Sequence, residues 1–265
     1  MHSTRNTSHL CLRAGLIIGL LLTSICHIAV GDEVHGYNDT PFLPDSEFRV
    51  HDPARPQSPH VDPGPPVASR PPPADALVLF DGTDLSHWTG ANWAVENGEM
   101  LVRHGDIETR RGFGDVQLHI EFLLPDQPHE NLTDRGNSGV FFMQQYELQI
   151  FGSHPDDGPV IYADGQCAAI YGQTPPRVNA SRRLGEWQTY DIVFTAPRFA
   201  GGQLTRPAKV TMFHNGVLVH LEQPFLGPTV WRALPHYSPH PDRLPLRLQE
   251  HGSPIRFRNI WIREL

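Results

Sequence analysis

Residues Gly136–Ile150 read GNSGVFFMQQYELQI, and their second half alternates between apolar and polar side chains. Tyr146 and Leu148 are apolar, whereas Glu147 and Gln149, which follow them in turn, are polar. Successive side chains of a β-strand point to opposite faces of its sheet. This stretch therefore predicts a strand with one face in a core and one polar face, exposed either to water or to a ligand.

The same period of two continues along most of the chain after residue 76. The segments that show it or that end in turn residues are ALVLFDG (76–82), NWAVENGEMLVRH (92–104), DVQLHIEFLL (115–124), EWQTYDIVFTA (186–196), AKVTMFHNGVLVHLE (208–222), LPLRLQEHG (244–252) and IRFRNIWIREL (255–265). Asn97-Gly98 and Asn215-Gly216 suit type I′ hairpin turns. No long stretch has the 3.6-residue period of a helix. Residues 77–265 therefore predict a single all-β domain, built as a two-sheet sandwich.

Composition supports this class and argues against one kind of partner. The chain has 265 residues, of which 39% are hydrophobic and 19% are charged, as in a globular protein. Its 23 glycines and 26 prolines favour short strands and turns over long helices. The net charge of −8 lacks the basic footprint that a nucleic-acid partner requires, so we expect no nucleic acid.

The first 31 residues resemble an export signal. Arg5 and Arg13 precede the apolar run AGLIIGLLLTSI (14–25), and Ala29-Val30-Gly31 offers small residues for cleavage. An uncleaved anchor is the alternative, because residues 14–30 approach the shortest length that spans a bilayer. We expect an exported protein, either periplasmic, secreted or at the cell surface, that touches a membrane only if this segment stays attached.

The mature chain would keep one cysteine. Cys11 and Cys26 lie in the signal, so Cys167 has no partner for an internal disulfide. A lone thiol can be a nucleophile, but a small buried cysteine that packs as an apolar residue is the commoner case.

Residues 32–76 predict a disordered, proline-rich linker. Residues 32–75 contain 11 prolines, including the run DPARPQSPHVDPGPPVASRPPP (52–73). Such composition favours an extended chain that builds no core of its own.

A second strand places polar groups beside those of the opening stretch. In LPLRLQEHG (244–252), Leu246 and Leu248 share one face, while Arg247, Gln249 and His251 share the other. Two such polar faces could form a groove whose planar donors and acceptors suit a sugar. The alternation alone equally fits an outer face that is simply solvated.

The segment Leu79–Trp88, LFDGTDLSHW, resembles the opening LF(N/D)G.DL..W of a family of exported bacterial proteins. That family is described as 3-keto-disaccharide hydrolase, or 3-keto-glucoside 1,2-lyase/hydratase. Further segments resemble it in order, namely FGDVQLHIEFLLP (113–125), RGNSGVFF (135–142), YELQI (146–150), GEWQTYDIVF (185–194), HNGV (214–217), LQEHG (248–252) and RFRNIWIREL (256–265). The resemblance covers residues 77–265 and implies a concanavalin A-like jelly roll with a saccharide-binding concave face.

Three segments are longer than the family pattern, namely residues 125–134, 198–207 and 225–245. Loops at the rim of a groove select the ligand. We therefore expect these segments to bear on the substrate more than on the fold.

The resemblance implies an exported carbohydrate-active enzyme that cleaves 3-keto-glycosides. The C3 carbonyl acidifies the C2 hydrogen, so a base can remove it and the glycosidic oxygen can leave C1. Water then adds to the double bond, and the net result is hydrolysis. Such an enzyme needs a base, a group that stabilises the enolate and an acid.

Glu147 and His251 are the catalytic candidates under this resemblance, because imidazole titrates near neutral pH and burial raises the pKa of a carboxyl. The expected substrate contacts are Arg135, Asn137, Gln149, Arg247, Gln249 and Trp187. For Asn137 a structural role is the alternative, because GNSG (136–139) also fits a tight turn before a strand. A divalent metal ion could instead polarise the keto oxygen, and His119, Glu147 and His251 are its candidate ligands. The sequence has no close His-x-His or Glu-x-x-His spacing to support it.

Two other functions remain open from the sequence. A non-catalytic carbohydrate-binding module would share the fold and the groove but would need no titratable base. Conventional hydrolysis by two carboxylates could use Glu147, with Glu250 as its partner on the neighbouring strand. The phase of Glu250, shared with Leu246 and Leu248, places it away from the groove.

Overall fold

The computed structural model describes residues 34–69, 71–90, 92–126 and 135–265. The predicted export signal lies outside these residues. Within them, no helix is long and apolar enough to cross a membrane. Asp32–Leu265 form one compact unit.

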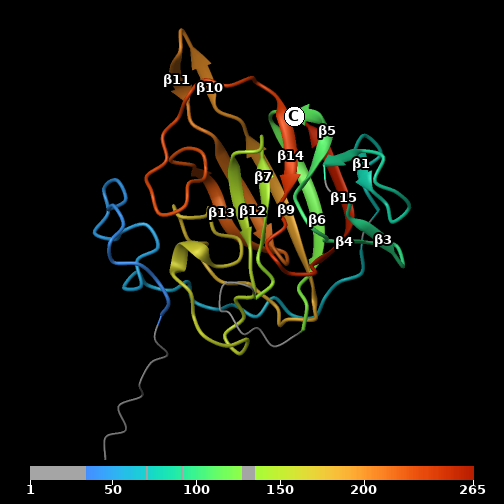
Figure 1. The fold of residues 1–265 in the computed structure, drawn as a ribbon, viewed down its shortest axis with the longest axis horizontal. Coiled ribbons are helices and arrows are strands. Elements are labelled where there is room, and N and C mark those ends of the chain that lie inside the picture. The colour runs from blue at the N-terminus through green and yellow to red at the C-terminus, as the bar shows by residue number, and fades with distance from the viewer. Residues whose placement is uncertain (1–33, 70, 91, 127–134) are drawn as a thin grey trace, which may run out of the picture. The chain divides into compact units, whose positions relative to one another are not determined.

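The larger of two stacked sheets has eight antiparallel strands (Figure 1). Their order is β13 (Val217–Pro224), β12 (Lys209–His214), β9 (Trp187–Thr195), β6 (Val116–Leu123), β15 (Arg256–Glu264), β4 (Glu99–Leu101) and β3 (Ala94–Glu96), with β1 (Leu77–Phe80) beside β15. The 198–207 segment forms a separate hairpin of β10 (Arg198–Ala200) and β11 (Gln203–Arg206). The described residues also contain one 3-10 turn, η2 (Ala163–Gly165).

The smaller sheet has five strands and carries the segments of greatest functional interest. Their order is β2 (Trp88–Gly90), β5 (Ile107–Phe113), β14 (Leu244–Leu248), β7 (Ser138–Phe142) and β8 (Tyr146–Ile150). In Figure 1, β5, β14 and β7 lie in front of the larger sheet. The expected all-β jelly-roll sandwich is therefore confirmed.

The core lies between the sheets and fixes the register of the smaller one. Val140, Leu148 and Leu248 are fully buried, as predicted, within one apolar cluster that spans both sheets. Phe142 stacks on Phe194 of β9 with ring centroids 4.5 Å apart. A slip of one residue would turn these side chains outward, so their burial fixes which face is polar.

Hairpin turns explain where the strands end. Asn97-Gly98 and Asn215-Gly216 have positive φ angles, as type I′ turns require. The turn between β7 and β8 has no such sequence signal, yet Met143 and Gln144 also adopt φ angles of 51° and 62°. The stretch 138–150 is therefore a hairpin, and its polar faces come from both arms.

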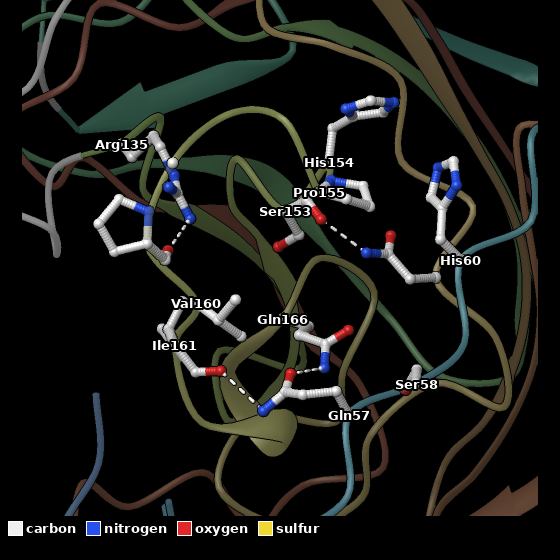
Figure 2. Close-up of a pocket in the computed structure, with 13 residues that line it drawn as sticks. Gln57, Ser58, His60, Arg135, Ser153, His154, Pro155, Val160, Ile161 and Gln166 are labelled. Atoms are coloured by element: carbon white, nitrogen blue, oxygen red, sulfur yellow. Dashed lines mark hydrogen bonds between the residues drawn. The ribbon is translucent and has the colours of Figure 1, made fainter. Parts of the chain in front are cut away.

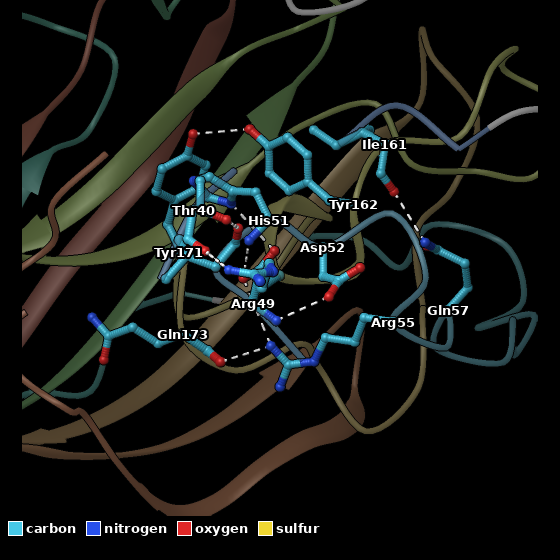
Figure 3. Close-up of polar contacts among 12 residues, drawn as sticks. Thr40, Arg49, His51, Asp52, Arg55, Gln57, Ile161, Tyr162, Tyr171 and Gln173 are labelled. Carbon is cyan, nitrogen blue, oxygen red and sulfur yellow. Dashed lines mark hydrogen bonds and ion pairs between the residues drawn. The ribbon is translucent and has the colours of Figure 1, made fainter. Parts of the chain in front are cut away.

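The N-terminal arm, residues 34–69, packs on the sandwich (Figure 3), so the prediction of a disordered linker over 32–76 is wrong for this part. Val50 and His51 are fully buried. The backbone N–H of His51 donates to Oδ2 of Asp164 at 3.0 Å, and its ring Nδ1 lies 3.2 Å from Oδ1. Prolines keep the backbone extended, but the side chains between them are free to bury against another surface.

Candidate functional site

The polar face of β7, β8 and β14 lines a pocket of about 480 Å³ on the side of the small sheet that faces away from the core. Its lining residues are Tyr37, Asn137, Phe141, Glu147, Gln149, Tyr162, Tyr171, Thr229, Trp231, Gln249 and His251. The volume falls within the roughly 300–1,000 Å³ that small-molecule sites occupy. Five residues selected from the sequence, Glu147, His251, Asn137, Gln149 and Gln249, thus meet in one cavity.

Glu147 lies deep in this pocket, with only 4% of its surface exposed. Burial raises the pKa of its carboxyl to about 8, an effect opposed by the charge of Arg247 and reinforced by that of Asp106. Its backbone N–H donates to Oγ1 of Thr229 at 3.1 Å, which holds the 225–245 segment against β8. A carboxyl with this pKa keeps its proton at neutral pH and can act as an acid.

Arg247, a predicted substrate contact, does not line the pocket, because three contacts hold its guanidinium behind Phe141 and away from the lining. Its guanidinium stacks 3.9 Å above the ring of Phe141, and Nη1 donates to Oδ2 of Asp106 at 2.6 Å. Nη2 donates to the carbonyl of Gln144. Arg247 therefore acts on Glu147 mainly through its charge, as a fixed cation beside the buried carboxyl.

Amide side chains and one imidazole supply the remaining polar groups. Nδ2 of Asn137 lies 3.4 Å from Nδ1 of His251, and both residues lie toward the solvent. Gln149 is 2% exposed, and its Oε1 is a buried acceptor without a hydrogen-bond partner. Buried polar atoms are normally satisfied, so this oxygen indicates a place for a ligand donor.

Aromatic side chains form the rest of the wall, and the sequence analysis did not select them. Tyr162 and Tyr171 join their hydroxyls at 3.0 Å (Figure 3), while Tyr37 comes from the arm and Trp231 from the long 225–245 segment. The length of that segment was the one sequence signal for Trp231. Nothing in the composition of the arm indicated Tyr37.

Arg135 does not line this pocket, contrary to the prediction of a substrate contact. Figure 2 shows it at a different cavity, where it donates to the carbonyls of Gly152, Asp157 and Pro159 at 2.8, 3.0 and 2.9 Å. The guanidinium of Arg135 donates all three of these hydrogen bonds to backbone carbonyls, so Arg135 holds the loop that follows β8 in place.

Trp187 and His119 belong to the other sheet. Trp187, on β9, lies under the guanidinium of Arg258 at 3.8 Å. His119, on β6, stacks on Trp261 and bonds through Nδ1 to Asp191 at 2.6 Å. Neither residue reaches the candidate pocket, so the predicted substrate contact and the third metal ligand are not brought to it.

Burial lowers the pKa of His119, but hydrogen bonds to Asp191 and Glu121 outweigh that effect and raise the pKa to about 9. The imidazole is therefore a charged partner in an ion-pair network. Across the described residues, no group of three or more His, Cys, Asp or Glu side chains is placed to hold a metal ion. The predicted ligand set therefore does not fit a metal centre.

Glu250 lies outside the pocket, as its phase predicts, and Cys167 does not line the pocket either. The carboxyl of Glu250 accepts from the backbone N–H groups of Gly105 and Gly252 at 3.2 and 2.6 Å, so it is bound in a loop. Cys167 is buried, and its Sγ lies 3.0 Å from the hydroxyl of Tyr190. Burial raises the pKa of this thiol, which disfavours the nucleophilic thiolate.

Comparison with known proteins agrees with the sandwich fold. Residues 75–263 match the sequence model of the 3-keto-alpha-glucoside-1,2-lyase-like domain. A crystal structure of a "putative glycosyl hydrolase" from Parabacteroides distasonis ATCC 8503 is 40% identical, covers 77% of this chain and 94% of its own, and superposes with a TM-score of 0.69.

Two further structures from the same organism and with the same description are 19% and 22% identical. Both cover 72% of this chain. The first matches over 94% of its own chain with a TM-score of 0.53, and the second over 99% of its own chain with a TM-score of 0.50. At that identity they show the fold alone. No curated protein matches the chain.

Proposed function

The chain belongs to the 3-keto-alpha-glucoside-1,2-lyase-like domain family, and on this premise we propose that it is a carbohydrate-active enzyme that cleaves 3-keto-glycosides. The reaction is elimination across C1 and C2, followed by hydration. The likeness to the 40%-identical glycosyl hydrolase structure supports cleavage of a glycosidic bond.

One observation carries this proposal: a buried carboxyl with a pKa near 8, an imidazole and an unpartnered amide oxygen line the same pocket. Acid and base catalysis requires two groups whose environments separate their protonation states. Burial raises the pKa of Glu147, whereas His251 lies toward the solvent.

The first half of the reaction uses both groups. His251 accepts the C2 proton, and the electrons of that bond move to the C3 carbonyl as an enolate. The enolate collapses to a C1–C2 double bond, the C1–oxygen bond breaks, and the leaving oxygen takes the proton of Glu147. The side-chain amides of Asn137 and Gln249 can donate to the enolate oxygen, and Oε1 of Gln149 can accept from a sugar hydroxyl.

The second half reverses the proton flow. The carboxylate of Glu147 takes a proton from water while the water oxygen bonds to C1, and the imidazolium returns a proton to C2. Both groups recover their starting states, and the net change is addition of one water. An acid and a base are required in each half, and both stay bound in the pocket.

Deuterium incorporation provides the sharpest test. The purified chain is incubated in D₂O with a 3-keto-glucoside and with its unoxidised parent, each with and without a chelator. We expect cleavage of the keto substrate alone, with one solvent deuterium at C2 of the product above a control without enzyme. Equal cleavage of the parent without deuterium would instead indicate hydrolysis by paired carboxylates.

The binding-module alternative gives a different result in the same assay. Sugar would bind without being cleaved, and Glu147→Gln would leave the affinity unchanged. Export through residues 1–31 is part of the proposal, and the N-terminal sequence of the mature protein from its native host tests it.

A further inference from the structure

A second cavity lies between the N-terminal arm and the loop that follows β8, and we propose that it binds one neutral monosaccharide. Its volume is about 220 Å³. Gln57, Ser58 and His60 of the arm line it, together with residues between Arg135 and Asn179 (Figure 2). Of the described residues, none lines both this cavity and the candidate pocket. Binding at this second cavity does not depend on the proposed function of the candidate pocket.

A buried acceptor in the wall of the second cavity points to a ligand. Gln166 is 4% exposed, and among the described residues no donor reaches its Oε1. The carbonyl of Ile161 can only accept, so Nε2 of Gln57 is the atom that lies 3.1 Å from it. Oε1 of Gln57 then accepts from Nε2 of Gln166 at 2.5 Å, as Figure 2 shows. This chain of bonds fixes the orientation of both amides, so Oε1 of Gln166 requires a donor that the described chain does not supply.

The charges around the second cavity favour an uncharged ligand. The guanidinium of Arg135 already donates to three backbone carbonyls. Burial lowers the pKa of His154, so its imidazole is neutral at neutral pH. Nδ1 of this ring accepts from the backbone N–H of Asp156 at 3.2 Å, which leaves the ring proton on Nε2 as a donor. A carboxylate or phosphate would therefore gain little charge-assisted binding here.

The remaining wall is largely apolar and encloses a small space. Pro155, Pro159, Val160 and Ile161 contribute hydrocarbon surface. A ligand that fits must place an apolar face on these side chains and hydroxyl groups on the polar atoms, because buried polar groups need partners. A pyranose ring has C–H groups on its faces and hydroxyls at its edge. The volume of about 220 Å³ is below the roughly 300 Å³ at which sites for drug-sized ligands begin, so it suits a single ring.

The arm forms one side of the second cavity and is held there by hydrogen bonds. Nε2 of His60 donates to the carbonyl of Ser181 at 3.2 Å, and the backbone N–H of Asn179 donates to the carbonyl of Pro59 at 3.0 Å. The family match begins at residue 75, so this side of the cavity comes from a segment that precedes it. A site that is formed before the ligand arrives loses little entropy on binding.

Chemical footprinting of histidines can locate a bound sugar, because His154 and His251 fall on different tryptic peptides. Residues 136–177 contain His154 as their one histidine, and residues 248–256 contain His251 as theirs. The full chain is treated with diethyl pyrocarbonate at increasing concentrations of methyl α-D-glucopyranoside, and mass spectrometry measures the modification of each peptide. We expect saturating sugar to slow the modification of His154 roughly fivefold or more, since a bound ring excludes the reagent. Methyl α-D-glucuronide, the same ring with a carboxylate, should protect His154 less.

Two variants test whether the cavity itself is responsible. Gln166→Met removes the acceptor, so the sugar concentration that half-protects His154 should rise about fivefold to tenfold, the scale of one lost hydrogen bond. Gln149→Met is the matched control, because it makes the same change at the unpartnered amide of the candidate pocket. Val160→Phe adds bulk to the cavity wall and should abolish protection. Val193→Phe, the same change at an exposed position of β9, should leave protection intact.

Several results would overturn the second site. In the wild type, modification of His154 at an unchanged rate would do so, whatever happens to His251. Equal protection of His154 in the wild type, Gln166→Met and Val160→Phe would do so as well. Stronger protection by the glucuronide would contradict an uncharged ligand. None of these measurements depends on cleavage of a keto-sugar, so a failure of the second site and a failure of the proposed function are separate outcomes.

Discussion

A Cβ atom on Gly139 would lie 2.7 Å from Oε1 of Glu147, so the buried carboxyl occupies space that a glycine at position 139 leaves free. The two residues sit on adjacent strands, because Gly139 pairs with Gln149 and Phe141 pairs with Glu147. Real Cβ contacts essentially never come this close, so a larger residue would move the carboxyl. The backbone of β7 thereby sets the position of the acid on β8.

Gly139→Ala should lower kcat roughly 10-fold or more, because the acid is displaced from its position. The added Cβ would also lie 2.7 Å from Cε2 of the rigid Phe141 ring, so some loss of stability should accompany the loss of kcat. A double-mutant cycle with Glu147→Gln checks the cause. In the Glu147→Gln variant, Gly139→Ala should lower kcat little further. If it lowers kcat there as much as in the wild type, this explanation is contradicted.

Glu147→Gln and His251→Ala should each lower turnover of a 3-keto-glycoside roughly 100-fold or more, the scale expected for a positioned acid or base. Neither side chain belongs to the apolar core, so circular dichroism spectra should stay close to those of the wild type. Steady-state kinetics measures the loss. Near-normal turnover in either variant would remove that residue from the mechanism.

The stability of the wild type should fall with rising pH relative to Glu147→Gln. The folded pKa of Glu147, about 8, exceeds the ordinary value of 4.5, so the folded state holds a proton that the unfolded chain releases. The contribution to stability is complete below about pH 4.5 and is lost as the pH rises through about 8. Urea unfolding of both proteins between about pH 4.5 and 8 measures the difference in the free energy of unfolding. A difference that stays constant with pH would refute this prediction.

Asp164→Ala should release the arm and lower the free energy of unfolding by roughly 3–5 kcal/mol, as expected when one partner of a buried polar pair is removed. Limited proteolysis with trypsin reports release, because the bond between Arg49 and Val50 becomes cleavable. Asp62→Ala is the control, since Asp62 is an exposed acid on the same arm. Equal resistance of both variants would show that other contacts hold the arm.

Cys167→Ser should retain turnover within about threefold, because the buried thiol lies away from the pocket and burial disfavours its charged form. Iodoacetamide should fail to label Cys167 in the native chain and should label it after denaturation, as mass spectrometry of the peptide that contains Cys167 reports. Rapid labelling of the native protein, or loss of turnover in the serine variant, would return Cys167 to the list of catalytic candidates.

The local pattern of residues determined the strands and their two faces. Tyr146, Leu148 and Leu248 are buried while Glu147 and Gln249 line the pocket, as their alternation predicted. The alternation predicts the two faces because the backbone geometry of a strand by itself places neighbouring side chains on opposite sides of the sheet. The Asn-Gly turns succeeded for a similar reason, since those residues tolerate the positive φ angles of type I′ turns.

Tertiary structure decided which of those faces meet and what covers them. Arg135, Trp187 and His119 have suitable chemistry in the sequence, but chain topology sends them to a loop and to the opposite sheet. The burial of Glu147, which raises its pKa, depends on contacts with strands and loops far along the chain. Tyr37 reaches the pocket through long-range contacts of the arm, among them the hydrogen bonds of His51 to Asp164, 113 residues away. Such long-range packing leaves no periodic trace in a proline-rich segment, so sequence patterns predicted the polar faces of β8 and β14 but not Tyr37, which the arm adds to the same pocket.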